Sequence, residues 1–190
     1  PENKVVNKAL YGNIRNAQDS LTFNYTKPTQ AFYVAKSGDD SNVGTSSSEP
    51  LLTIGKAISR AESKDSIIVY PGKYEEDVNY DGKNLFIASR YHATKDSTYR
   101  DSTIIQGNVM MDSLDNAQLS GLTIYKAGIF IYGGSSQIDM LSVRESTIGA
   151  IYIDENADVK LNHVKIINNT KSDHGAGFYI RDSKVELNNS

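Results

Sequence analysis

The second half of the chain repeats itself at a nearly constant interval. From about residue 117, four segments align at offsets of 21, 21 and 26 residues: Gln118–Leu122, Asp139–Val143, Lys160–Val164 and Glu186–Asn189. Apolar residues then fall in three columns: Ala117, Ile138, Val159 and Val185; Leu119, Met140, Leu161 and Leu187; Leu122, Val143 and Val164. A repeat of this length with two or three short strands is typical of one coil of a β-solenoid. Each coil would bury its alternate residues against the coils on either side.

A second set of strands follows the same rule. Its apolar residues form two further columns, at offsets of 22 and 27 residues: Ile129, Ile151 and Phe178; Ile131, Ile153 and Ile180. In both sets the last interval is longer than the one before it. We therefore expect one loop, at residues 168–174, to absorb an insertion.

The chain divides into two parts. Residues 1–30 show no sustained periodicity, and we interpret them as a leader or a tether. Residues 31–190 are expected to form the N-terminal portion of a parallel β-helix. Because the last residues stop inside a coil, we expect the protein to continue into further domains beyond Ser190.

The best helix signal lies ahead of the repeats. Thr53 is a favourable N-cap, and the residues after it place a one-sided apolar stripe at helical spacing: Ile54, Ala57, Ile58 and Ala61. A helix with one apolar face must lie on something apolar. We therefore expect residues 53–61 to cap the N-terminal end of the coils.

Composition removes several classes of function. The 190 residues carry 20 Lys and Arg against 23 Asp and Glu, a net charge of −3, so no basic surface for nucleic acid is expected. The chain lacks an apolar run of the roughly 18 residues that a membrane span requires, so no membrane insertion is expected. Cysteine is absent, and the three histidines, His92, His163 and His174, are too far apart in sequence to predict a metal site.

One short run could hold a cation. Asp39, Asp40 and Asn42 place oxygen ligands close together ahead of Gly44, as at the start of a calcium loop, but the closing acidic residue of a complete loop is missing. Asx turns account for the same residues. Calcium binding and a metal-free turn both stay open here, and we favour the turn.

One outward column is aromatic. If the apolar columns at 129, 131, 151 and 153 point inward, alternation places Phe130, Tyr152 and Tyr179 on the solvent side. The next outward column, Tyr132, Asp154 and Arg181, would border these rings with hydrogen-bonding groups. Sugar rings pack on aromatic side chains while polar neighbours bind their hydroxyls, so these residues form a candidate carbohydrate-binding site. The alternatives are a cross-strand ladder, a stripe covered by another segment, and a catalytic groove.

An ordered set of motifs supports the same fold. In chain order they are Phe32–Val34, Gly38–Thr45, Pro50–Ile58, Ile67–Glu76 and Thr103–Gly107. Together they resemble the N-terminal segment of secreted bacterial right-handed parallel β-helix proteins, the pectate-lyase-like superfamily. The resemblance implies an extracellular or cell-surface protein. It does not determine the activity, since a similar N-terminal segment occurs in polysaccharide lyases, hydrolases, epimerases and non-catalytic surface proteins.

The resemblance also implies what catalysis would require. In the calcium-dependent lyases of this superfamily, clustered carboxylates hold a cation on one face and a Lys or Arg abstracts a proton. Two outward columns contain charged residues: Gln118, Asp139, Lys160 and Glu186; Thr123, Arg144 and Lys165. The first alternates in charge, which predicts an ion-pair ladder between coils, and the second offers bases without acids. If the protein is a polysaccharide lyase or glycoside hydrolase, its catalytic residues are expected outside these 190 residues.

The sequence thus predicts an all-β fold, a right-handed parallel β-helix with a short N-terminal capping α-helix. The expected function is a secreted or cell-surface module that binds polysaccharide or another cell-surface glycan. It could form the first part of a polysaccharide-degrading enzyme. The alternative is a non-catalytic structural stalk or adhesin segment of a large surface protein.

Overall fold

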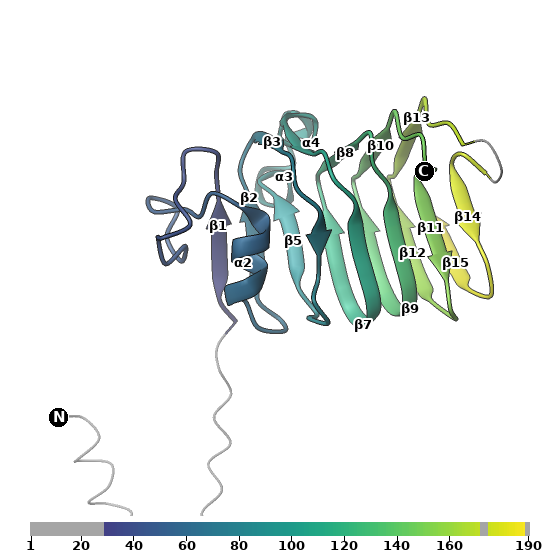
Figure 1. Ribbon diagram of the computed structural model, residues 1–190, viewed down its shortest axis with the longest axis horizontal. Helices are drawn as coiled ribbons and strands as arrows, with labels where there is room; N and C mark the ends of the chain where they lie inside the picture. Colours follow the sequence, from purple (N-terminus) through teal and green to yellow (C-terminus); the bar gives the residue numbers. More distant parts are fainter. Residues whose placement is uncertain (1–28, 172–174, 189–190) are drawn as a thin grey trace, which may run out of the picture.

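The computed structural model describes residues 29–171 and 175–188, and these wind into a parallel β-helix (Figure 1). From β2 onward, the chain visits three faces in the same order. Face 2 is a five-stranded sheet, with one strand from each successive turn: β3 (Gly72–Tyr74), β6 (Thr103–Ile105), β8 (Thr123–Tyr125), β10 (Ser142–Arg144) and β13 (Lys165–Ile167). All of its strand pairs are parallel, as the repeat predicted.

Faces 1 and 3 share two long strands, β7 (Val109–Ser120) and β9 (Ile129–Asp139). The second halves of these strands lie on face 1 with β1 (Ala31–Val34), β2 (Ser66–Val69), β5 (Phe86–Ser89), β12 (Asp158–Asn162) and β15 (Lys184–Asn188). Their first halves lie on face 3 with β4 (Val78–Asn79), β11 (Ile151–Asp154) and β14 (Phe178–Ile180). The chain bends between the two faces without leaving the ladder, so one strand can position residues on both.

Three short helices accompany the strands in the described part of the chain. The predicted helix is confirmed as α2 (Ile54–Arg60), and the Thr53 hydroxyl accepts a hydrogen bond of 3.2 Å from the backbone N–H of Lys56. It packs on β1, β2 and β4. Because β1 precedes α2 and pairs with β2, the helix belongs to the first turn. The prediction that the helix precedes every coil is therefore wrong. The other two helices, α3 (Tyr91–Thr94) and α4 (Ser97–Ser102), lie between β5 and β6.

The core consists of apolar columns that run along the helix axis. One of them stacks Leu119, Ile138 and Leu161, each fully buried. Burying such a side chain stabilises the fold by roughly 1.5–3 kcal/mol. Two tyrosines are also fully buried, and their hydroxyls donate to backbone carbonyls: Tyr74 to Tyr70 and Tyr80 to Gln118, both at 2.8 Å. The backbone therefore satisfies both of these buried tyrosine hydroxyls.

The register on face 1 differs from the sequence alignment. Gln118 pairs with Gln137, and Gln137 pairs with Lys160, so these turns are spaced by 19 and 23 residues. The predicted neighbour Asp139 lies two residues further on, beside Asn162. The predicted Asp139–Lys160 ion pair is therefore wrong. A slip of two residues leaves every side chain on the same face, so the hydrophobic pattern could not reveal it.

The same two-residue shift also changes the predicted neighbours in the other columns of this turn. Ile138 replaces Met140 between Leu119 and Leu161, and Ser136 replaces Ile138 between Ala117 and Val159. On face 2, Val143 lies beside Ile124 and Ser142 takes the place predicted for Arg144. Met140 instead forms a left-handed turn, with φ of 52°, that connects face 1 to face 2.

Candidate carbohydrate-binding surface

The three predicted aromatic residues lie side by side on face 3. Tyr152 on β11 pairs with Phe130 on β9 and with Tyr179 on β14. We call Phe130, Tyr152 and Tyr179 the aromatic row. All three side chains are half-buried, and the isoleucines on either side of Phe130 and Tyr152 are buried in the core. The predicted register of this face is therefore confirmed.

The row extends one turn further than the sequence indicated. Met110 on β7 pairs with Phe130 and is 39% exposed, whereas its neighbours Val109 and Met111 are buried. The sequence does contain a signal for Met110, since inward and outward residues alternate at 109–112. It was missed because the aligned repeats began near residue 117. A flexible thioether thus adjoins the phenyl ring at the row's N-terminal end.

The rings contact one another closely. The ring centroids of Tyr152 and Tyr179 are 4.5 Å apart with an interplanar angle of 9°, which is a stacked arrangement. Phe130 is tilted by 34° at 6.1 Å from Tyr152. Because each tyrosine ring covers one face of the other, a ligand beside this pair would meet mainly ring edges and hydroxyls. This geometry matches the ladder alternative as well as it matches a sugar platform.

A charged pair borders the row. The Asp154 side chain accepts hydrogen bonds from the Tyr152 hydroxyl at 2.9 Å, from Arg181 Nε at 2.9 Å and from the Glu155 backbone N–H at 2.8 Å. Asp154 was expected to be exposed, but only 2% of it is accessible. Arg181, which follows β14 in the next turn, lies over it and is itself exposed. The bordering column is thus a fixed ion pair.

Hydrogen bonds within this group of side chains set its protonation state at neutral pH. The hydrogen bond from Arg181 holds the pKa of Asp154 below its usual range. The hydrogen bond to Asp154 raises the pKa of Tyr152 to about 12. At neutral pH, Asp154 is therefore ionised and the Tyr152 hydroxyl stays protonated as a donor. Tyr152 is then a poor base or nucleophile, and its ring orientation is fixed.

The surface around the row is shallow. A hollow of about 10 Å³ lies beside the three rings, between them and Ile148 and Lys171. This volume is far below that of ordinary ligand pockets, which hold roughly 300–1,000 Å³. A ligand would therefore lie along face 3 without entering a cavity. An extended polymer suits such a surface better than a single small molecule.

The candidate calcium residues are engaged within their own loop. Asp40 accepts hydrogen bonds from the backbone N–H of Leu52 at 2.9 Å and of Thr53 at 3.0 Å, and its second oxygen accepts from the Thr53 hydroxyl at 2.8 Å. Asp39 accepts from the Ser41 backbone N–H, as in an Asx turn, and Asn42 donates to the Pro50 carbonyl. These contacts explain the loop without a cation. Calcium binding stays a prediction.

Other candidate groups are dispersed. Within residues 29–171 and 175–188, no three His, Cys, Asp or Glu side chains lie close enough to hold a metal ion. His163 contacts Asp139 at 3.3 Å on the surface, and His174 lies outside the described residues. None of the helices in the described part of the chain has the length and apolar character of a membrane span.

Fold and surface together define a parallel β-helix with a fixed aromatic row along one face. A family model described as "Protein of unknown function (DUF1565)" matches residues 36–190. The chain therefore belongs to the DUF1565 family. Neither the search of curated proteins nor the search of solved structures gave a match.

Proposed function

We propose that this protein is a secreted or cell-surface module that binds a polysaccharide along face 3. The observation that carries the proposal is the straight column of apolar side chains, Met110 followed by the aromatic row, beside the fixed Asp154–Arg181 pair. Its residues repeat at the spacing of the turns, about 4.8 Å. A linear polymer with repeated apolar and hydroxyl groups would contact such a column at several points.

The two parts of the surface would have different roles. Aromatic edges and the Met110 side chain would contact the apolar C–H groups of a sugar. Arg181 uses its Nε and Nη2 atoms to bind Asp154, which leaves the Nη1 amino group available to sugar hydroxyls or to an acidic substituent. The surface offers binding groups without a paired acid and base. If the whole protein degrades polysaccharide, we propose that catalysis lies outside these residues.

The second candidate function is a structural stalk or adhesin segment. The stacking of Tyr152 on Tyr179 favours it, since stacked rings in adjacent turns stabilise a ladder without any ligand. The two functions predict different results for the same substitutions. In a stalk the rings contribute to stability, and in a binding module they contribute to affinity.

The test is native affinity electrophoresis in gels that contain neutral or acidic polysaccharides, with and without calcium. We expect retardation in at least one gel, and about tenfold weaker affinity for the double variant Tyr152→Ala, Tyr179→Ala. The matched control is Tyr125→Ala, because Tyr125 is a half-buried tyrosine that faces outward on face 2. Free migration in every gel, together with a lowered melting temperature of the double variant, would favour the stalk.

A further inference from the structure

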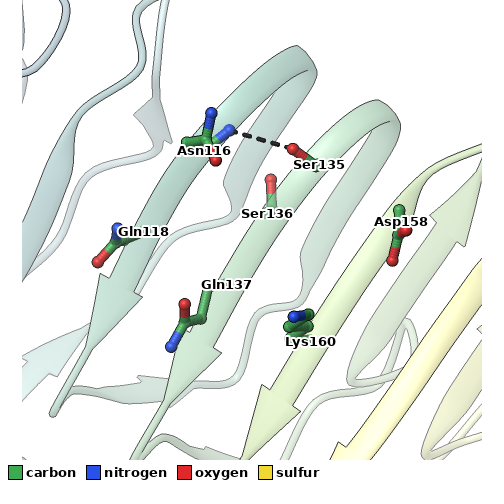
Figure 2. A pocket seen from close by; sticks show the side chains of 7 residues that line it. All are labelled: Asn116, Gln118, Ser135, Ser136, Gln137, Asp158 and Lys160. Atoms are coloured by element: carbon green, nitrogen blue, oxygen red, sulfur yellow. Dashed lines mark hydrogen bonds between the residues drawn. The ribbon is translucent and has the colours of Figure 1, made fainter.

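A polar groove lies on face 1, around the bend from the aromatic row. Its central hollow, of about 270 Å³, is lined by three neighbouring strands (Figure 2). The lining residues are polar throughout, and the central ones are Asn116 and Gln118 from β7, Gln137 from β9, and Asp158 and Lys160 from β12. A second hollow of about 400 Å³ shares Asn116 and Gln118 and extends to Asn84 and Phe86 on the preceding turn. The groove therefore runs across several turns.

A β-bulge forms the centre of the groove. The pairing of β7 with β9 shifts by one residue between Asp115 and Ala117, which leaves Asn116 as the extra residue. Asn116 has a φ of 74°, and its backbone N–H donates to the Ser135 hydroxyl at 3.2 Å. Bulges redirect side chains and are common next to binding sites. Here the bulge places a side-chain amide at the wall of the groove.

Several buried oxygen atoms along the groove lack a partner. Ser136 is only 5% exposed, and its hydroxyl has no hydrogen bond within the described residues. Two more oxygen atoms are buried without a hydrogen bond within the described residues: Asp158 Oδ1, and Asn84 Oδ1 in the adjoining hollow. Ser136 stands in an inward column between Ala117 and Val159, where an apolar residue would be expected. Unpaired buried polar groups cost free energy, so they require an explanation.

The chemistry of the lining selects one class of ligand. Amide and hydroxyl side chains both donate and accept hydrogen bonds, as the hydroxyls of a sugar do. Lys160 and Asp158 carry opposite charges, and Asp158 Oδ2 is paired with Lys184 at 2.9 Å. The central hollow has neither an apolar wall nor an excess of charge. An apolar ligand and a strongly charged ligand are both disfavoured.

We propose that the face 1 groove binds a neutral glycan chain that crosses the strands along the helix axis. Gln118 and Gln137 occupy successive turns of one outward column, so they would bind successive hydroxyl groups of the chain. Phe86, next to Gln118 in the same column, would close one end of the groove with an apolar surface. This site lies on a different face from the aromatic row and does not depend on it.

The test is a nuclear magnetic resonance titration of the ¹⁵N-labelled 190-residue protein. The probes are linear neutral hexasaccharides of glucose (α- or β-1,4-linked), mannose and xylose, with hexagalacturonate as the acidic comparison. We expect the side-chain amide signals of Gln118 and Gln137 to shift with a neutral probe. The double variant Gln118→Ala, Gln137→Ala should bind that probe about tenfold more weakly, because two hydrogen-bonding groups are removed.

The variant Tyr152→Ala, Tyr179→Ala separates this site from the aromatic row. If the groove binds independently, the two amide signals shift as before in that variant. The proposal is overturned if no neutral hexasaccharide at about 10 mM moves the two signals, since even a millimolar Kd would then be saturated. Backbone amide signals of β7 and β9 report binding in the glutamine variant, which lacks the two side-chain amides. The proposal is also overturned if the neutral probe no longer binds the tyrosine variant but binds the glutamine variant as tightly as the wild type.

Discussion

The first and last turns of the β-helix both contribute apolar residues to the core columns, but the contacts that cover these residues differ. In the first turn, the segment at residues 44–51 covers the outer edge of β1: Tyr33 N–H donates to the Gly44 carbonyl and Leu51 N–H to the Tyr33 carbonyl, both at 2.8 Å. Val34 and Leu51 are fully buried. Within the described residues, no segment pairs with the outer edge of β14 or β15.

The last turn relies on surface pairs. Leu187 continues the column of Leu161 but is 53% exposed, and Ile180 continues that of Ile153 but is 45% exposed. Side-chain pairs link this turn to the one before it on two faces: Tyr179 with Tyr152, Arg181 with Asp154, Lys184 with Asp158, and Asn188 with Asn162. In these columns an apolar residue is thus buried where the chain covers it on both sides, and in the last turn side-chain pairs supplement the backbone ladder.

Two leucines of one column give the largest expected contrast. Leu161→Ala should lower the free energy of unfolding by about 2–5 kcal/mol, because it leaves a cavity between two turns. Leu187→Ala is the matched control and should cost far less, since its side chain is already half in water. Chemical denaturation of both variants measures the difference. Equal losses would contradict the comparison, because they would mean that Leu187 is covered in solution.

Asp40 should matter next, since it fastens the covering loop to α2. Its side chain accepts hydrogen bonds from Leu52 and Thr53, and its carbonyl accepts one from Arg60. Asp40→Ala should cost about 1–3 kcal/mol through unsatisfied backbone donors. Hydrogen exchange should accelerate in β1 first. The control is Asp39→Ala, whose carboxylate accepts its hydrogen bond from nearby Ser41, and a similar loss there would contradict this assignment.

The sequence predicted the fold and face 3 for a definite physical reason. Isoleucine pairs at 129 and 131 and at 151 and 153 recur at one offset, so a single alignment fits the face. Face 1 could not be predicted in the same way. A two-residue slip preserves alternation, and the bulge at Asn116 is a property of the backbone. The burial of Asp154 escaped prediction because it depends on Arg181 from another turn.

The Arg181–Asp154 pair should give the last turn a pH-dependent stability. Because the folded pKa of Asp154 is lowered, the ionised pair stabilises the fold at any pH above the ordinary Asp value of about 3.9. That contribution is lost as the pH falls through the lowered pKa. Arg181→Ala should therefore melt at a lower temperature than the wild type at pH 7 and at pH 5.

The difference in melting temperature between wild type and Arg181→Ala should shrink below about pH 4. Thermal melts from pH 7 to pH 2 measure it. Asp154→Asn is a useful companion background, because it removes the titrating partner. In that background, the effect of Arg181→Ala on the melting temperature should change little with pH in this range. A difference that stays constant down to pH 2 would mean that the pair does not stabilise the last turn.

The smallest effect is expected at the other charged pair of the last turn. The Lys184 and Asp158 side chains are 72% and 46% exposed, and ion pairs in water contribute little to stability. Lys184→Ala should therefore leave the unfolding free energy almost unchanged, and 1 M salt should abolish what remains. Its local effect is more informative, because the pair joins β15 to β12. Faster hydrogen exchange confined to β15 would show that surface pairs hold the register of the last turn, whereas unchanged exchange would assign that role to the backbone ladder alone.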